Sequence, residues 1–144
     1  EFMVKFSTVY SGILDRNDVK LINSVSDNYT ITYDPHRLWQ VLEYLIENAL
    51  GFIPKKSGIV EIGSKNTNEQ IILFVKDNGS GIPYGETGKL FQKFYQVDSS
   101  KRRRHFGLGL GLPICKEIIE QLGGKIWIET KEGVGTTVYF SIPK

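Results

Sequence analysis

The sequence predicts an α/β sandwich in which one mixed, mainly antiparallel sheet is covered on one face by about three helices. Segments that alternate apolar and polar residues occur in pairs joined by turn residues, which is typical of antiparallel strands. Segments with apolar residues three and four positions apart separate these pairs, which is typical of amphipathic helices. A chain of 144 residues with 40% hydrophobic residues has the size of one domain with a single core.

The N-terminal part is predicted to contribute little to this fold. Residues 1–3 are interpreted as a cloning scar, because Glu-Phe is what a common cloning site encodes. Residues 4–16 are expected to be a linker, with only a strand or a helical turn over Val4–Leu14. The domain itself is assigned to residues 17–144 and begins with an antiparallel hairpin, Asp18–Asn23 and Tyr29–Tyr33.

A long helix is predicted next. Asp34 is a suitable N-cap and Pro35 suits the first helical position. The helix should end before Pro54, since proline disrupts a helix interior. The predicted core face has apolar residues at three- and four-residue spacing: Leu38, Val41, Leu42, Leu45, Ile46 and Ala49.

Four further strands and two helices complete the predicted order. Strands at Ile59–Lys65 and Gln70–Lys76 flank a polar turn, and a short helix is expected near Leu90–Tyr95. Pro113 should begin a helix that ends at Gly123-Gly124. The chain closes with a hairpin formed by Lys125–Thr130 and Thr136–Ile142.

Composition narrows the classes of function. A formal net charge of +2 is too small for a general nucleic-acid binder, so we expect no nucleic-acid partner. One cysteine and two histidines argue against a structural zinc site or an internal disulfide. No apolar segment approaches the roughly 20 residues that cross a bilayer. We therefore expect a soluble, cytoplasmic domain, which includes the case of the cytosolic part of a membrane-anchored sensor.

The most informative motif is Asp77-Asn78-Gly79-Ser80-Gly81-Ile82. Asp77 shares strand parity with Ile71, Leu73 and Val75, so its carboxylate should lie on the buried side of the sheet. A buried carboxylate needs hydrogen-bond donors, from its own loop or from a ligand such as the adenine amino group. Spacing alone leaves both open.

Two other features suggest a phosphate-bearing ligand. Asn48 lies near the end of the long helix, and its carboxamide oxygen suits Mg²⁺ that is already bound to phosphates. The alternative is a solvated side chain. A glycine-rich segment precedes the helix at Pro113, where free N–H groups attract anions, although glycines that only cap and pack are the alternative. The segment comprises Gly107, Leu108, Gly109, Leu110, Gly111 and Leu112.

Taken in order, these motifs resemble the catalytic, ATP-binding domain of sensor histidine kinases, in the GHKL group of ATPases and kinases. Asp34–Leu38 through Glu47–Ala49 is similar to the N box, and Asp77–Ile82 to the G1 box. Leu90–Tyr95 is similar to the F box, and Gly107–Leu112 to the G2 box. The resemblance covers about Tyr33–Pro143 and implies a Bergerat-type ATP-binding fold with a mobile ATP lid at about Gln96–Phe106.

The resemblance implies roles for individual residues. Asp77 would accept from the adenine amino group, with Thr136 sharing a water, and Asn48 would hold Mg²⁺. Glu47 is a weaker candidate for ordering a water or the metal shell. The remaining expected ATP contacts are Phe52 on the adenine ring, Gly79, Gly81, Ile82, Phe94 and the six residues of the glycine-rich segment from Gly107 to Leu112.

Three positions depart from the family pattern. Tyr44 stands where an additional Asn is common, Gly51 where a Lys often approaches the phosphates, and Gln96 where an Arg is frequent. Lys55, Arg102, Arg103 and Arg104 are possible replacements as phosphate contacts.

The implied function is transfer of the ATP γ-phosphoryl group to a histidine on a separate dimerisation domain of the same protein, with ADP as product. A response regulator receiver domain would be the downstream partner. The isolated domain would be monomeric and the full-length protein a homodimer. The alternative is a nucleotide-binding regulatory or docking module with weak or no kinase activity.

Overall fold

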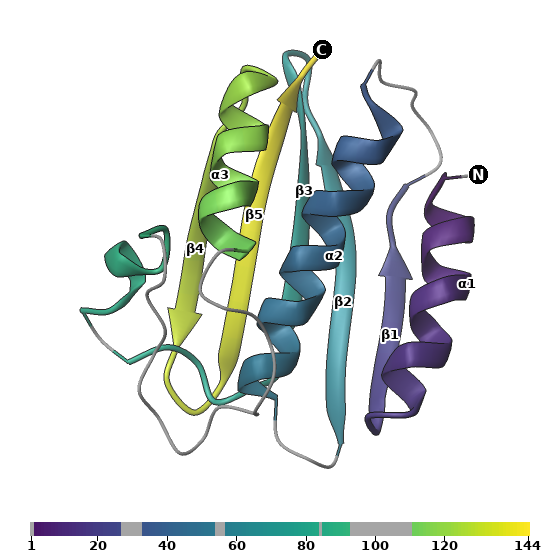
Figure 1. Ribbon diagram of the computed structural model, residues 1–144, viewed down its shortest axis with the longest axis vertical. Helices are drawn as coiled ribbons and strands as arrows, with labels where there is room; N and C mark the ends of the chain where they lie inside the picture. Colours follow the sequence, from purple (N-terminus) through teal and green to yellow (C-terminus); the bar gives the residue numbers. More distant parts are fainter. Residues whose placement is uncertain (1, 27–32, 54–56, 84, 93–110) are drawn as a thin grey trace.

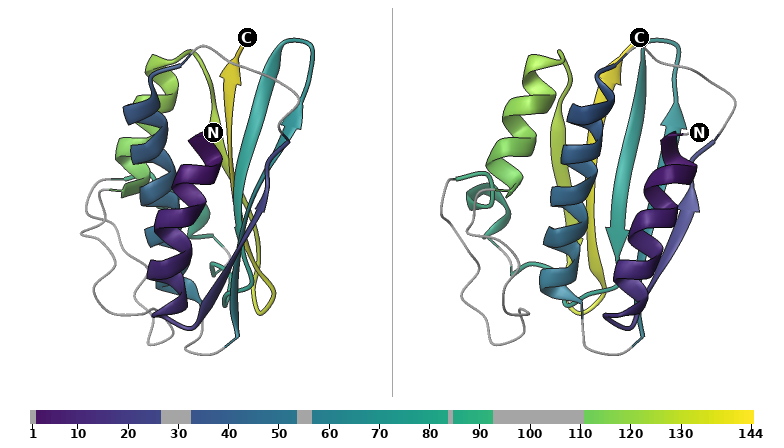
Figure 2. Two further views of the ribbon diagram at one scale, coloured as in Figure 1. Left: turned by 90° about the vertical axis from the view of Figure 1, so that its right-hand side faces the viewer. Right: turned by 45° about the vertical axis from the view of Figure 1, so that its right-hand side comes forward.

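The computed structural model describes residues 2–26, 33–53, 57–83, 85–92 and 111–144. Over these residues, a single five-stranded sheet carries helices on one face and leaves the other face uncovered (Figures 1 and 2). The predicted fold class is therefore confirmed. In chain order the elements are α1 Phe2–Asp15, β1 Val19–Ser24, α2 Pro35–Phe52, β2 Gly58–Asn66, β3 Gln70–Asp77, the 3₁₀ turn η1 Thr87–Lys89, α3 Gly111–Gln121, β4 Ile126–Lys131 and β5 Gly135–Pro143.

The strand order is β1-β2-β3-β5-β4, and among the strands that the structure describes only β1 and β2 run parallel. Parallel neighbours need a crossover connection, which α2 provides by returning the chain across the helix-covered face. We predicted β1 as half of a hairpin. Its parallel pairing with β2 was not predicted, and the other half, 29–33, lies mostly outside the described residues.

Helix α1 corrects the prediction of a linker strand or helical turn over Val4–Leu14. Phe6, Tyr10 and Leu14 follow one another at four-residue spacing, which places them on one face of a helix. Phe6 and Leu14 are fully buried in the core that the sheet and α2 share. Phe2, which the sequence analysis interprets as part of a cloning scar, packs its ring edge-on against Tyr33 and Trp39.

Helix α2 forms as predicted. The Asp34 carboxylate accepts from the backbone N–H groups of His36 at 2.9 Å and Arg37 at 3.4 Å, which caps the first turn. All six residues of the predicted core face are buried. No helix is found at residues 90–92, the described part of the short helix predicted near Leu90–Tyr95. The 3₁₀ turn η1 lies immediately before these residues, and residues 93–95 are not described.

The two faces of the sheet differ in composition. On the covered face, β3 and β5 bury alternate residues, from Ile71 to Asp77 and from Ile142 to Thr136. On the open face, four residues in direct cross-strand register form a row: Gly63, Phe74, Tyr139 and Trp127. A Cβ atom at Gly63 would lie 2.2 Å from the Phe74 ring, so that ring occupies the space over the glycine.

Candidate functional site

The candidate site is built around Asp77, the last residue of β3. Its side chain is only 4% exposed and lies on the covered face, as strand parity predicted. One carboxylate oxygen accepts from the Gly79 N–H at 2.8 Å, and the Thr136 backbone also donates to the carboxylate. Burial outweighs these hydrogen bonds and raises the pKa of Asp77 to about 6.

The loop that follows Asp77 is held by close backbone contacts. A Cβ atom at Gly79 would lie 2.4 Å from the Phe52 carbonyl oxygen, and the Ser80 N–H donates to that oxygen at 2.9 Å. Gly81 has φ +74°, and a Cβ there would lie 2.4 Å from the Lys131 carbonyl oxygen. Both glycines are therefore required for the loop to pass between the end of α2 and the β4–β5 turn.

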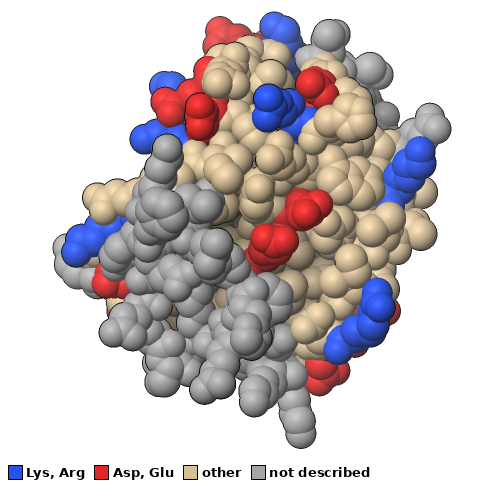
Figure 3. Space-filling model, viewed as in Figure 1, with Lys and Arg blue, Asp and Glu red and all other residues tan. Residues whose placement is uncertain are grey.

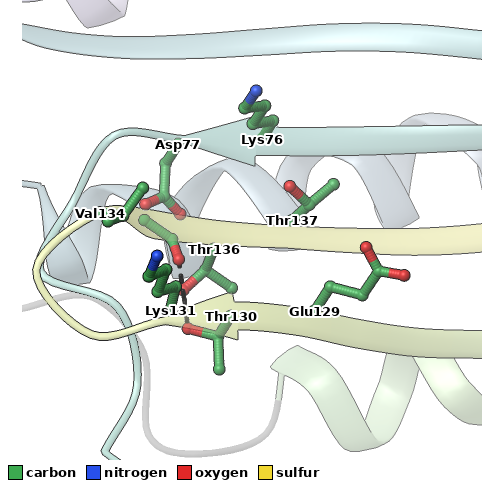
Figure 4. A pocket seen from close by; sticks show the side chains of 9 residues that line it. Lys76, Asp77, Glu129, Thr130, Lys131, Val134, Thr136 and Thr137 are labelled. Carbon is green, nitrogen blue, oxygen red and sulfur yellow. Dashed lines mark hydrogen bonds between the residues drawn. The ribbon is translucent and has the colours of Figure 1, made fainter.

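The β4–β5 hairpin contributes two hydroxyl groups beside this loop. Thr130 and Thr136 are opposite one another in the register, with their Oγ1 atoms 2.9 Å apart (Figure 4). Thr130 Oγ1 also accepts from the Ile82 N–H at 2.9 Å and donates to the Gly135 carbonyl at 3.2 Å. Thr136 is 3% exposed and is paired in register with Asp77.

A cavity of about 240 Å³ lies at this end of the sheet (Figure 4). Its lining includes Asp77 and Thr136, but also Lys76, Thr137 and Glu129, which alternate to the other face of the sheet. The cavity therefore opens at the sheet end and not between the sheet and α2. The candidate site is therefore centred on the Asp77–Thr136 pair and does not follow the outline of the cavity.

Helix α2 carries three of the predicted site residues, Glu47, Asn48 and Phe52. Asn48 and Glu47 are half-buried, whereas the Phe52 ring is only 2% exposed and belongs to the core. Acidic side chains gather over the middle of α2, whose acidic residues are Glu43 and Glu47 (Figure 3). Burial raises the pKa of Glu47, and the neighbouring Glu43 raises it further.

The glycine-rich segment is described only at its end. Gly111 begins the described part of α3, and Leu112 is buried. A Cβ at Gly111 would lie 3.4 Å from the Tyr44 ring, so Tyr44 packs beside the start of α3. The other predicted contacts lie outside the described residues: Lys55, Phe94, Arg102, Arg103, Arg104, Gly107, Leu108, Gly109 and Leu110.

Sequence reasoning missed Thr130. Its place opposite Thr136 follows from the register of the hairpin, and the polar turn between the two strands was the available signal. Within the described ranges, no group of three or more His, Cys, Asp or Glu side chains is arranged to hold a metal ion. The helices that the structure describes include none with the length and apolar character of a membrane span.

Comparisons with known proteins agree on one family. Residues 33–144 match the histidine kinase-, DNA gyrase B-, and HSP90-like ATPases. The sensor histidine kinase WalK of Bacillus subtilis (strain 168) is 37% identical over 127 residues, which cover 87% of this chain and 21% of that protein. The chain spans between 21% and 36% of the length of the first curated relatives that it matches.

Solved structures match almost the whole chain. The nucleotide-free catalytic domain of histidine kinase ThkA superposes with a TM-score of 0.82 at 26% identity, covering 99% of this chain and 90% of that one. ThkA in complex with the response regulator protein TrrA matches with a TM-score of 0.77 at 26% identity, covering 99% and 39%. Three helices on one face of an open sheet are therefore the fold of histidine kinase catalytic domains.

Proposed function

We propose, from the premise that this chain belongs to the family of histidine kinase-, DNA gyrase B-, and HSP90-like ATPases, that it is the ATP- and Mg²⁺-binding catalytic domain of a sensor histidine kinase. The observation that carries the proposal is the buried Asp77 carboxylate, held at the end of β3 beside Thr136. A carboxylate in that setting accepts from a donor-bearing ligand edge, and the adenine amino group is such a donor.

The reaction is transfer of the γ-phosphoryl group. An imidazole nitrogen on a separate dimerisation domain forms a bond to the γ-phosphorus, the bond from that phosphorus to the bridging oxygen breaks, and ADP leaves. The imidazole proton passes to a base. Since the transition state is loose, positioning and charge neutralisation supply most of the catalysis.

The side chains on α2 fit the metal-bearing end of the nucleotide. Magnesium held by phosphates keeps several waters and takes few protein ligands, so a single carboxamide oxygen from Asn48 suffices. The bound ion neutralises charge on the phosphates. Glu47, one position earlier on the same helix, is the candidate to order a water or to accept the proton, and its raised pKa suits a base.

A test of Asn48 has a readout apart from activity. Asn48→Ala should weaken Mg²⁺-dependent ATP binding about tenfold and leave metal-free ADP binding unchanged, as measured by titration calorimetry. Asn68→Ala, in the exposed β2–β3 turn at the other end of β3, is the matched control. Equal loss of metal-free and metal-dependent binding would reject the metal role.

The partners follow from the chemistry. His36, the only histidine among the described residues, lies in the first turn of α2. The acceptor histidine is proposed on the dimerisation domain of a homodimeric full-length protein. A response regulator receiver domain then takes the phosphoryl group, by analogy with the ThkA–TrrA complex. Because ATP is the donor, we propose that the domain works in the cytoplasm.

A second candidate, a nucleotide-binding regulatory module, is favoured by two features of α2. Tyr44 packs against the start of α3, and buried Gly51 offers no charge to the phosphates. Supplying the dimerisation domain in trans with γ-labelled ATP separates the two. Label on the acceptor histidine supports the kinase, whereas tight ATP binding without transfer supports the module.

A further inference from the structure

The structure carries an inference about how the adenine end of the site discriminates between bases, and it rests on the proposed function. We infer that Thr130, which faces Thr136 across the β4–β5 hairpin, is a positioning residue for nucleobase selectivity. It fixes the direction of the Thr136 hydroxyl so that the wall beside Asp77 presents hydrogen-bond acceptors only.

The inference begins with the hydrogen-bonding capacity of Thr130. A threonine hydroxyl has one proton to donate and two lone pairs that accept. Its proton is directed at the Gly135 carbonyl, 3.2 Å away, and one lone pair accepts from the Ile82 N–H at 2.9 Å. Only one lone pair remains for the contact with Thr136 Oγ1 at 2.9 Å.

The direction of the Thr130–Thr136 hydrogen bond follows. The geometry of the Thr130–Thr136 contact alone allows either hydroxyl to donate. A carbonyl oxygen only accepts, so with the Thr130 proton on the Gly135 carbonyl we assign Thr136 as the donor, and its proton is used inside the hairpin. Thr136 then offers only lone pairs to a ligand. Its side chain is 3% exposed, so bulk water does not readily replace the Thr130 partner and free the proton.

Asp77 adds the second acceptor. When ionised it has no proton to donate, and the N–H groups of Gly79 and Thr136 already stabilise the carboxylate from within the protein. The remaining lone pairs of Asp77 and Thr136 therefore form an acceptor-only edge. Such an edge fits an exocyclic amino group, which carries two N–H donors, and repels a carbonyl oxygen in the same place.

Thr130 also links this edge to the loop. Through the Ile82 N–H it joins the segment after Gly81 to β4, while Asp77 lies at the start of the same loop. Removing its hydroxyl changes two things at once: Thr136 regains a free proton, and the Ile82 N–H loses its acceptor. A variant that keeps the hydroxyl should preserve both.

The test compares ATP with inosine triphosphate, which carries a 6-oxo group and an N1–H where ATP carries a 6-amino group and an unprotonated N1. Dissociation constants are measured with Mg²⁺ at pH 8 for the wild-type chain, Thr130→Ser and Thr130→Val. We expect the wild type and Thr130→Ser to share an ATP preference within about twofold. In Thr130→Val the preference should fall about tenfold, mainly through weaker ATP binding.

Thermal unfolding of each variant accompanies the titrations. If Thr130→Val does not fold, Thr130→Cys replaces it, because the thiol is a weak donor and acceptor of similar size and should lower the preference by a smaller factor. An unchanged preference in a folded Val or Cys variant overturns the inference. So does a loss in Thr130→Ser as large as in Thr130→Val, since packing would then be the cause.

The inference and the proposed function fail in different ways. Absence of ATP binding by the wild-type chain overturns both. ATP binding and phosphoryl transfer by the wild type, with an ATP preference that does not depend on the hydroxyl at position 130, overturn the inference alone.

Discussion

Asp77 is held where its own charge is unfavourable, and this has a cost in stability. Its pKa is raised from 3.8 to about 6 in the fold, so the folded state binds the proton more tightly than the unfolded chain. The stabilisation from the protonated carboxyl is complete below pH 4 and is lost as the pH rises through 6. Residues arranged for a ligand commonly carry such strain before the ligand binds.

Asp77→Asn should therefore stabilise the nucleotide-free chain at high pH. At pH 8 the variant should exceed the wild type in free energy of unfolding by up to roughly 3 kcal/mol, because no buried charge remains. At pH 4 the two should differ little. Urea unfolding at both pH values measures this, and an equal difference at pH 4 and pH 8 would contradict the assigned cause.

The same residue predicts how ATP binding depends on pH. If Asp77 accepts from the adenine amino group as proposed, ATP affinity of the wild type should fall as the pH decreases below about 6, because protonation removes the carboxylate charge. Asp77→Asn should abolish most binding at every pH. Calorimetric titration between pH 5 and pH 8 tests this. A flat profile for the wild type would show that Asp77 does not accept from the base.

At the scale of single residues, the local sequence pattern was sufficient to predict where the Asp77 side chain lies, but it was not sufficient to identify Thr130. Strand parity alone placed the Asp77 carboxylate on the buried side. The role of Thr130 depends on which residue faces it across the hairpin and on a hydrogen bond to Ile82, 48 positions away along the chain. No pattern within one segment contains that information.

Among the elements, α2 has the most explicit sequence signals and a testable cap. Replacing Asp34 by Ala leaves the N–H groups of His36 and Arg37 without their side-chain acceptor. We expect a loss of about 1 kcal/mol in the free energy of unfolding. Asp34→Ser, which can still cap, should lose only a few tenths of that. Equal losses in both variants would mean that the cap is not the cause.

The row of residues on the open face makes a second prediction at this scale. Gly63→Ala places a Cβ against the Phe74 ring and should destabilise the chain by about 1–3 kcal/mol. Gly12→Ala in α1, where nothing lies within 4 Å of the added atom, is the matched control and should be neutral or slightly stabilising. Chemical unfolding of each variant gives the comparison.

A double-mutant cycle isolates the contact. Combined with Phe74→Ala, the Gly63→Ala change should cost less than it does alone, because the ring that it meets is gone. Additive losses would show that Gly63 is needed for another reason.

Two elements, α1 and β1, could be predicted only in part from the sequence. Apolar residues at four-residue spacing in α1 were present, but interspersed small and polar residues made the segment ambiguous. Alternation identified β1 as a strand without indicating its partner, because the pairing with β2 spans the whole of α2. Helix α2, with a cap, a proline and a long apolar face, was predicted almost to the residue.

At the scale of the whole molecule, ligand binding should raise the melting temperature of the folded domain. A ligand that binds only the folded state at 100 times its dissociation constant adds about 2.7 kcal/mol, or roughly 6–10 °C in melting temperature for a domain of this size. ATP with Mg²⁺ should produce such a shift. Asp77→Asn should show none under the same conditions, and a shift that persists in this variant would place the nucleotide elsewhere.

The fold class was predictable because it depends on the number and order of elements, which local periodicity reveals. The composition of the site was predictable in part, since four motifs in a fixed order are specific together. The edge of the sheet formed by β1 could not be predicted. Its attachment, together with that of α1, depends on contacts between Phe6, Leu14 and a core assembled from the rest of the chain.

The chain has two tryptophans, and the fold puts them in separate optical environments. Trp39 touches the rings of Phe6 and Tyr10 between α1 and α2, whereas Trp127 is stacked on Tyr139 on the open face. Trp127→Phe would leave one fluorophore whose emission reports whether α1 stays docked. Trp39→Phe would leave another that follows the sheet, so detachment of the N-terminal helix could be timed separately from global unfolding.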